Sequence, residues 1–341
     1  MMIIINATVG VNMSTIKIRN IELKNRICIA PLAGITDLPF RLILKEMGAS
    51  LMTTELVSAK GIYYNNPGNS KIMATDIKEA PIALQLFGND PLLIARVAEK
   101  VCDDYDIIDI NMGCPVLKVV RNGEGAALMK DVHLAASIIS MLKRVIGDKK
   151  VITAKMRIGF ENHNINGVEF AKALEDAGVD MITVHGRTRN EFYGGEVHKD
   201  VIKKIKESVK IPVIANGNIF SIYDAKDMLD YTGCDGIALA RGIKGNPLFV
   251  RECIEYIENG NIIERPSLIE IKNMMLRHVK DKVDFKGEKV GIPEMRPHIA
   301  WYTVGLKDSS KFRLKVNSVK TKDEMDYIIN EFFDITDKSM D

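Results

Sequence analysis

Short apolar runs rich in β-branched residues recur at regular intervals through the first 245 residues. There are eight of them: Ile27–Ala30, Ser50–Thr54, Ile82–Leu86, Ile107–Ile110, Val151–Lys155, Met181–Val184, Pro212–Ala215 and Gly236–Ala240. In the intervening segments, apolar residues recur every three or four positions, as over Pro91–Cys102, Leu134–Val145, Gly167–Ala177 and Ile222–Leu229. Strands that alternate with amphipathic helices predict βαβ units and a parallel sheet.

Eight such units in about 220 residues favour an α/β fold of the (β/α)8 TIM-barrel type. The alternative is a doubly wound open sheet, which would carry a glycine-rich turn after its first strand. The first apolar run leads instead into Pro31-Leu32-Ala33-Gly34, without a GxGxxG pattern. The sequence therefore favours the closed barrel.

The strand pattern stops near Pro266, and helical spacing takes over. We expect helices over Leu268–Val283, His298–Leu306 and Asp323–Phe333. Because Asn259-Gly260-Asn261 interrupts the pattern, we predict a barrel over residues 14–261 and a small all-α domain over residues 262–341. Residues 1–13 end in a second methionine, and we interpret them as either a disordered leader or an upstream-start artefact.

Composition narrows the class of protein. No apolar run approaches the roughly 20 residues that span a bilayer, and the apolar opening lacks a basic n-region. The five cysteines include no CxxC pair, which argues against a disulfide framework and against a zinc site. We therefore expect a reduced, cytoplasmic protein without a metal, and nothing implies an obligate protein partner.

Charged residues are unevenly distributed along the chain, although the net charge is only +2. Lys272–Lys322 holds thirteen basic and five acidic residues, a local charge of +8, and Asp323–Asp341 has a local charge of −6. A basic segment in a nearly neutral chain indicates a surface for a polyanion such as RNA. A solvated helical face is the alternative.

Barrel enzymes carry their functional residues at the carboxyl ends of the strands. Here the apolar runs are followed by Pro31–Gly34, Glu55, Gln85, Asn111–Pro115, Lys155–Arg157, His185–Thr188, Asn216–Asn218 and Arg241-Gly242. The loops after the seventh and eighth strands often bind phosphate, for which Gly217 and Arg241 are suited. The alternative is that the glycines only make tight turns.

Three side chains at these ends have more than one interpretation. Lys155 ends an apolar strand, so it could neutralise a cofactor, form the Schiff base of an aldolase, or pair with Glu55 or another acid at a strand end. Cys114 lies in a loop, where it is either a nucleophile or proton donor or an incidental thiol. His185, taken alone, fits a core histidine better than a ligand.

Seven motifs, in this order, resemble those of the tRNA-dihydrouridine synthases, and most closely the bacterial DusB-like branch. They are Ala30–Arg41, Gln85–Gly88, Asp109–Pro115, Lys155–Gly159, Val184–Thr188, Asn216–Ile219 and Ala240–Pro247. The resemblance extends from about Ile16 to about Met325. It departs from the family at Pro297, where a basic residue is usual, and at Asn218 and Ala240, which replace Asp and Gly.

The resemblance implies an FMN-binding barrel followed by a helical RNA-binding domain. The residues implied to bind FMN are Pro31, Leu32, Ala33 and Gln85 at the ring, Lys155 near N1 and O2, and His185, Asn216, Gly217, Asn218, Ala240 and Arg241 at the phosphate. NADPH would reduce the flavin. Hydride would pass from flavin N5 to C6 of a uridine in tRNA, and Cys114 would give the proton to C5. Asn111 and Arg157 would contact the substrate base.

Two other functions remain open at this point. A flavin barrel that acts on a free pyrimidine, as dihydroorotate dehydrogenases do, would share the chemistry without needing a basic C-terminal segment. An RNA-binding protein that has lost catalysis would keep the basic segment and lack the flavin.

Overall fold

Eight parallel strands form the centre of the molecule. The computed structural model describes residues 15–147 and 149–337. Its barrel strands are β3 (Ile27–Ile29), β4 (Met52–Thr53), β6 (Ile82–Phe87), β7 (Ile107–Met112), β8 (Val151–Gly159), β9 (Met181–Thr188), β10 (Val213–Asn216) and β11 (Gly236–Leu239). They are ordered β3-β11-β10-β9-β8-β7-β6-β4, and an isolated bridge between Cys28 and Leu51 joins the two ends. The predicted (β/α)8 barrel is confirmed.

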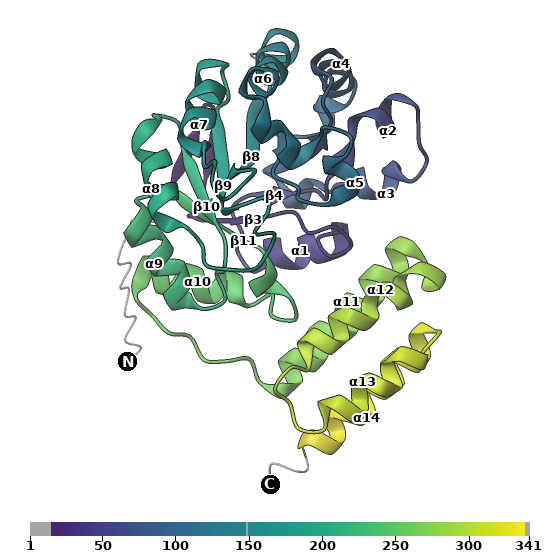
Figure 1. Cartoon of the computed structure of the whole chain (residues 1–341). Coiled ribbons are helices and arrows are strands. Elements are labelled where there is room, and N and C mark those ends of the chain that lie inside the picture. Colours follow the sequence, from purple (N-terminus) through teal and green to yellow (C-terminus); the bar gives the residue numbers. More distant parts are fainter. Residues whose placement is uncertain (1–14, 148, 338–341) are drawn as a thin grey trace, which may run out of the picture.

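Helices surround this sheet (Figure 1). They are α1 (Leu38–Glu46), α2 (Ala59–Tyr63), α3 (Asn69–Met73), α4 (Pro91–Val101), α5 (Leu117–Val120), α6 (Val132–Ile146), α7 (Gly167–Asp176), α8 (Lys199–Ser208), α9 (Ile222–Thr232) and α10 (Phe249–Asn259). A short strand, β5 (Val57–Ser58), extends the pairing along β6. The predicted helices correspond to α4, α6, α7 and α9. Both faces of the parallel strands are thereby buried, which explains their continuous apolar runs.

An antiparallel hairpin that the sequence analysis missed covers the amino ends of the strands. It consists of β1 (Ile16–Ile18) and β2 (Ile21–Leu23). Ile16, Ile18 and Leu23 are buried in one cluster with residues from the amino ends of the barrel strands, such as Met181. Because this end is closed by apolar packing, the opposite, carboxyl end is left for function.

Four helices follow the barrel: α11 (Leu268–Lys286), α12 (Glu288–Tyr302), α13 (Ser309–Ser318) and α14 (Lys322–Asp337). They share a hydrophobic cluster of their own, which includes Met275, Ile299 and Phe312. In the described part of the chain, no helix is long and apolar enough to cross a membrane.

The predicted helix His298–Leu306 is wrong in its bounds. The structure has one helix, α12, that begins at Glu288, continues through Pro293 and Pro297 and ends at Tyr302. Proline usually ends a helix because it lacks an N–H and clashes with the preceding turn. Here the buried side chains of Ile292, Met295 and Ile299 pack in the helical core, and this packing outweighs the local cost.

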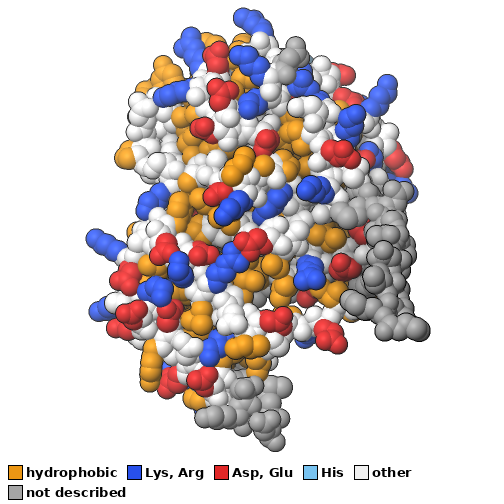
Figure 2. Space-filling view, turned by 180° about the vertical axis from the view of Figure 1, so that it is seen from behind, with side chains coloured by type: hydrophobic (Ala, Val, Ile, Leu, Met, Phe, Trp, Pro, Cys, Tyr) orange, Lys and Arg blue, Asp and Glu red, His pale blue; other side chains and the backbone are white. Residues whose placement is uncertain are grey.

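Ion pairs absorb much of the positive charge counted in Lys272–Lys322. At least eight of its thirteen basic residues pair with a carboxylate, and the partners include Asp37 and Glu46 of the barrel. On the face of the molecule seen in Figure 2, basic and acidic side chains are interspersed. The segment therefore has a weaker external field than its composition suggests.

Candidate active site

A single cavity at the carboxyl ends of the barrel strands brings together all fourteen residues that the sequence analysis selected. It is lined by Pro31, Leu32, Ala33, Gln85, Asn111, Cys114, Lys155, Arg157, His185, Asn216, Gly217, Asn218, Ala240 and Arg241, among others. These residues come from seven of the eight strand ends, so only the barrel fold makes them neighbours.

The loop after β10 has a backbone that requires glycine. Gly217 has φ +135°, and a Cβ there would lie 2.9 Å from Cγ2 of Val197 and 3.2 Å from Cδ2 of His185. The next residue, Asn218, has φ 48°, and its Oδ1 accepts a hydrogen bond of 2.8 Å from Nη2 of Arg241. The loops after β10 and β11 are thus tied together, and the glycine does more than make a tight turn: it lets the backbone lie against His185.

Lys155 does not pair with Glu55. Its Nζ donates to Oδ1 of Asn216 at 3.2 Å, whereas the carboxylate of Glu55 accepts from the backbone N–H of Gly34. Burial, reinforced by the neighbouring Arg157, lowers the pKa of Lys155 to about 8. A buried ammonium whose charge is this poorly compensated favours an anionic ligand.

His185 is surrounded by cationic groups. Burial first, and then the charges of Lys155, Arg157, Arg187 and Arg241, hold its pKa well below the usual value. The imidazole is therefore neutral at physiological pH, and its environment carries an excess of positive charge. Such an environment suits a phosphate or an anionic ring.

Cys114 is half-buried on the loop after β7, and two neighbours fix its main chain. Its N–H donates to Oδ1 of Asn111 at 2.8 Å, and Arg157 Nε donates to the carbonyl of Gly113 at 2.9 Å. Burial raises the pKa of the thiol, and Val116 N–H and Arg157 only partly oppose this effect. The thiol is therefore protonated at neutral pH and able to donate a proton. The other four cysteines are buried and free.

A buried chain of hydrogen bonds extends from this loop into the barrel. Asn111 Nδ2 donates to Gln85 Oε1 at 2.8 Å, and Gln85 Nε2 donates to Asp109 Oδ2 at 2.7 Å. Thr153 Oγ1 completes the chain with a bond of 2.6 Å to Asp109 Oδ1. The sequence motifs include Asp109, but neither Asp109 nor Thr153 is among the predicted site residues. Each stands two positions before a selected residue on the same strand, and the period of two in a β-strand could have identified both.

Two aromatic side chains at the cavity mouth were also missed. Tyr193 and Phe220 line the cavity, and their ring centroids lie 5.3 and 5.2 Å from the guanidinium of Arg241. Both rings are partly exposed. They offer flat surfaces beside a cation, which is an arrangement suited to a nucleobase and its phosphate.

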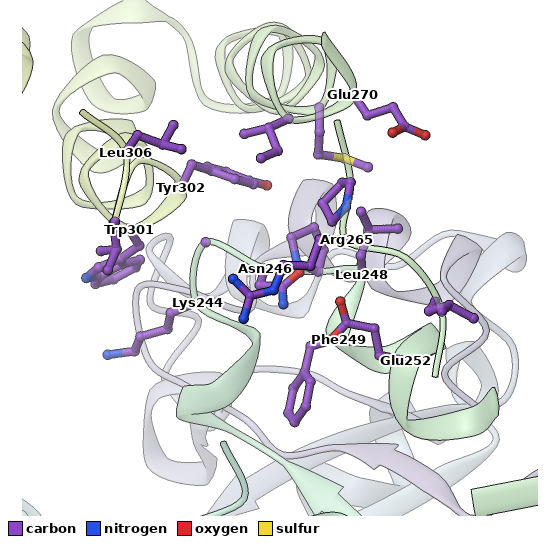
Figure 3. A pocket seen from close by; sticks show the side chains of 18 of the residues that line it. Lys244, Asn246, Leu248, Phe249, Glu252, Arg265, Glu270, Trp301, Tyr302 and Leu306 are labelled. Carbon is purple, nitrogen blue, oxygen red and sulfur yellow. The ribbon is translucent and has the colours of Figure 1, made fainter. Parts of the chain in front are cut away.

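A second and larger cavity, of about 1120 Å³, lies between the barrel and the helices α11 and α12. Figure 3 shows Lys244 and Trp301 on one side of it and Arg265 near its centre. Lys244 Nζ lies 4.6 Å from the centroid of the Trp301 ring. Phe220 lines both cavities, so the larger one adjoins the smaller at this side chain.

Comparison with known proteins decides the family. A family model described as dihydrouridine synthase matches residues 28–338. The chain belongs to the dihydrouridine synthase family. It is 41% identical over 323 residues to a probable tRNA-dihydrouridine synthase of Rickettsia conorii, covering 93% of this chain and 96% of that protein. It is 34% identical to tRNA-dihydrouridine synthase B of Pseudomonas aeruginosa, covering 94% and 96%.

As a member of the dihydrouridine synthase family, the chain is an enzyme of the oxidoreductase class. Solved structures with low sequence identity share its barrel. A histamine dehydrogenase from Rhizobium sp. 4-9 aligns with a TM-score of 0.55 at 15% identity, covering 80% of this chain and 51% of that one. An old yellow enzyme homologue from Zymomonas mobilis aligns with a TM-score of 0.51 at 16% identity, covering 74% and 94%. Among the described residues, no cluster of His, Cys, Asp or Glu could hold a metal ion.

Proposed function

We propose that this enzyme uses FMN to reduce the C5–C6 double bond of specific uridines in tRNA, with NADPH as reductant, in the cytoplasm. The observation that carries the proposal is the content of the smaller cavity. It combines a cluster of cations around the buried His185 with a protonated thiol, Cys114, at the carboxyl ends of the strands. The family assignment favours this function over a Schiff-base aldolase.

The residues of the cavity suit the two ends of FMN. The phosphate would be held by the loop of Asn216, Gly217 and Asn218, with His185, Ala240 and Arg241 beside it. The ring would lie against the main chain of Pro31, Leu32 and Ala33, with Gln85 at its pyrimidine edge. Lys155 donates one hydrogen bond within the described residues and keeps two N–H groups for the N1–O2 side. When bound and reduced, FMN supplies a hydride from N5 to C6 of the uracil.

The protein itself supplies the proton. Cys114, whose pKa is raised by burial, would give its proton to C5 of the uracil. Asn111 and Arg157 fix the loop that carries the thiol, and each has donor capacity left: one N–H of the Asn111 amide, and Nη2 of Arg157. We assign these donors to the substrate base, which must leave the RNA stack to reach the cavity.

The RNA would lie along the larger cavity, with the helices α11 and α12 as its second wall. Lys244, Arg265 and Lys307 supply positive charge there, and Trp301 supplies a stacking surface. This assignment places the RNA in the cleft that Figure 3 shows, not along the whole Lys272–Lys322 segment. In this proposal one nucleotide would pass Phe220, which lines both cavities, to reach the smaller one.

The decisive experiment measures the absorbance spectrum of the purified protein and the two half-reactions of the flavin, its reduction and its reoxidation. We expect the purified protein to be yellow with one FMN per chain, to be reduced by NADPH and to be reoxidised by tRNA lacking dihydrouridine. Reoxidation by free uracil or orotate, at the rate seen with tRNA, would favour the free-pyrimidine enzyme instead. Protein that is colourless and does not take up added FMN would refute the proposal and favour an RNA-binding protein without catalysis.

A further inference from the structure

A buried ionic group joins the barrel to helix α11. Lys282 Nζ lies 2.7 Å from Asp37 Oδ2, and Lys286 Nζ lies 3.0 Å from the same oxygen. Lys286 also contacts Glu294 of α12 at 2.6 Å. The side chains of Lys282 and Asp37 are 0% and 1% exposed. Burying charges this completely is costly unless they are paired, so Lys282 and Asp37 must stay opposite each other.

Asp37 ends the loop that begins with Pro31. It caps the N-terminus of α1 by accepting from the backbone N–H of Phe40. Just before it, Thr36 closes the loop, since its N–H donates to the carbonyl of Leu32 at 3.0 Å and its Oγ1 accepts from Leu32 N–H at 2.9 Å. The loop is therefore a closed turn with one end fixed at Asp37. Because Leu32 lines the smaller cavity, a shift of Asp37 would be transmitted to the cavity wall.

The C-terminal helices α11–α14 also contact the loop after β11, through the end of α12. Gly245 has φ +68°, and a Cβ there would lie only 2.2 Å from the carbonyl carbon of Trp301. The backbones of this loop and of the end of α12 are thus in direct contact. Arg241 lies four residues before Gly245 on the same loop. Both loops proposed to hold the two ends of FMN are therefore braced from outside the barrel.

We propose that Lys282 and Lys286 of α11 are positioning residues for flavin binding, which act by holding Asp37 and with it the loop 31–37. This inference rests on the proposed function for the identity of the cofactor. It assigns the helical part a task besides contact with RNA: without the two lysines, the barrel keeps every residue that touches FMN but loses the brace on one wall of the site.

The test compares two interdomain contacts of the same helix. Lys282→Met removes the buried pair, and Arg277→Gln removes the bidentate pair with Glu46, whose bonds of 2.5 and 2.6 Å join α11 to the far end of α1. Both weaken the interface, but only Lys282 reaches the loop. We expect Lys282→Met to raise the FMN Kd about tenfold or more and to speed hydrogen exchange of the backbone N–H groups in residues 32–37. Arg277→Gln should leave both quantities close to wild type.

Equal effects of the two substitutions would show a general role in domain contact and overturn the proposal, and so would the absence of an effect from Lys282→Met. Where Lys282→Met fails to fold, Lys286→Met, at the less buried edge of the group, decides by the same two measurements. Hydrogen exchange is measured on cofactor-free protein. If wild-type protein does not bind FMN, but Lys282→Met still speeds exchange in residues 32–37 of cofactor-free protein, the proposed function is refuted while the link between Lys282 and the loop stands.

Discussion

At the scale of the residue, Cys114 is held mainly by hydrogen bonds of its main chain, whereas its thiol contacts only the neighbouring Val116 N–H among the backbone groups that lower its pKa. Oδ1 of Asn111 accepts a hydrogen bond from the N–H of Cys114, and the carbonyl of Cys114 accepts one of 3.0 Å from the N–H of Ala126. Truncating the thiol removes its contact with the Val116 N–H but leaves in place the main-chain hydrogen bonds that hold the loop. A functional role and an incidental one can be separated by substitution without disturbing the fold.

Cys114→Ala is expected to retain FMN and to be reduced by NADPH at nearly the wild-type rate, because that half-reaction needs no proton on C5. Reoxidation by tRNA should slow by about 10²–10⁴-fold, the usual contribution of a positioned acid. Cys114→Ser should be similarly impaired, since a hydroxyl is a far weaker acid. Stopped-flow absorbance of the flavin measures both steps, and wild-type reoxidation of the alanine variant would show that another group is the acid.

The pH dependence of this step follows from the direction of the pKa shift. Burial raises the pKa of Cys114 above its ordinary value, so the acid form is present throughout the neutral range and is lost only at alkaline pH. The wild-type reoxidation rate should therefore be flat near pH 7 and fall at high pH. This alkaline fall should be absent from the residual rate of Cys114→Ala.

At the scale of the element, the positions of the strand ends predicted which residues lie in one cavity. Because parallel strands of a barrel all point their carboxyl ends to one mouth, the order of apolar runs was enough to assign polar residues such as Gln85 and Asn216 to one site. The partners of those residues could not be assigned, because a buried hydrogen bond such as that of Thr153 with Asp109 depends on which side chains face each other across strands. The same limit applied to Lys155, whose neighbour is Asn216 and not Glu55.

The predicted helix bounds are wrong where local conformational preference and tertiary packing oppose each other. Pro297 is a helix-ending residue by its covalent geometry, and the predicted helix begins at the next residue, His298. In the structure α12 passes through it, because residues on both sides are buried in the helical core. The β1–β2 hairpin was missed for a related reason. Its strands have three residues each, too few for a period of two to be recognised, and its stability comes from packing on the barrel.

The loop after β10 gives a prediction at this scale. Gly217→Ala places a Cβ against Val197 and His185 at a φ that side chains rarely adopt, a strain of about 1–3 kcal/mol. If the loop rearranges to relieve it, the FMN Kd should rise about tenfold or more, since each 1.4 kcal/mol corresponds to a factor of ten. Titration of cofactor-free protein with FMN measures this change.

Gly233→Ala is the matched control. Gly233 also has positive φ, +64°, but it ends α9 and a Cβ there meets nothing within 4 Å. It should lower thermal stability modestly and leave the FMN Kd unchanged. An equal rise of the Kd in both variants would mean that backbone strain in general, and not the shape of the β10 loop, governs FMN binding.

At the scale of the whole molecule, the distribution of charge differs from what composition indicates. The local excess in Lys272–Lys322 is largely neutralised by ion pairs, of which Lys282 with Asp37 and Arg277 with Glu46 connect the helices to the barrel. The same residues that suggest an RNA-binding surface in the sequence thus hold the two parts together. The site that we propose for RNA is therefore the cleft between them, where Lys244 and Arg265 lie.

RNA binding should therefore depend on the cleft. Binding of tRNA by the full chain should weaken steeply with salt, and Lys244→Gln and Arg265→Gln should each lower affinity and reduce the slope of log K against log salt by about 1, as loss of one phosphate contact requires. Lys204→Gln, on the outer helix α8 where Lys204 pairs with Asp200, is the control and should change neither quantity. Fluorescence anisotropy with labelled tRNA at several salt concentrations measures the slopes. If the control reduces the slope as much as the cleft variants do, the RNA contacts charge over the whole surface, and the cleft is not its path.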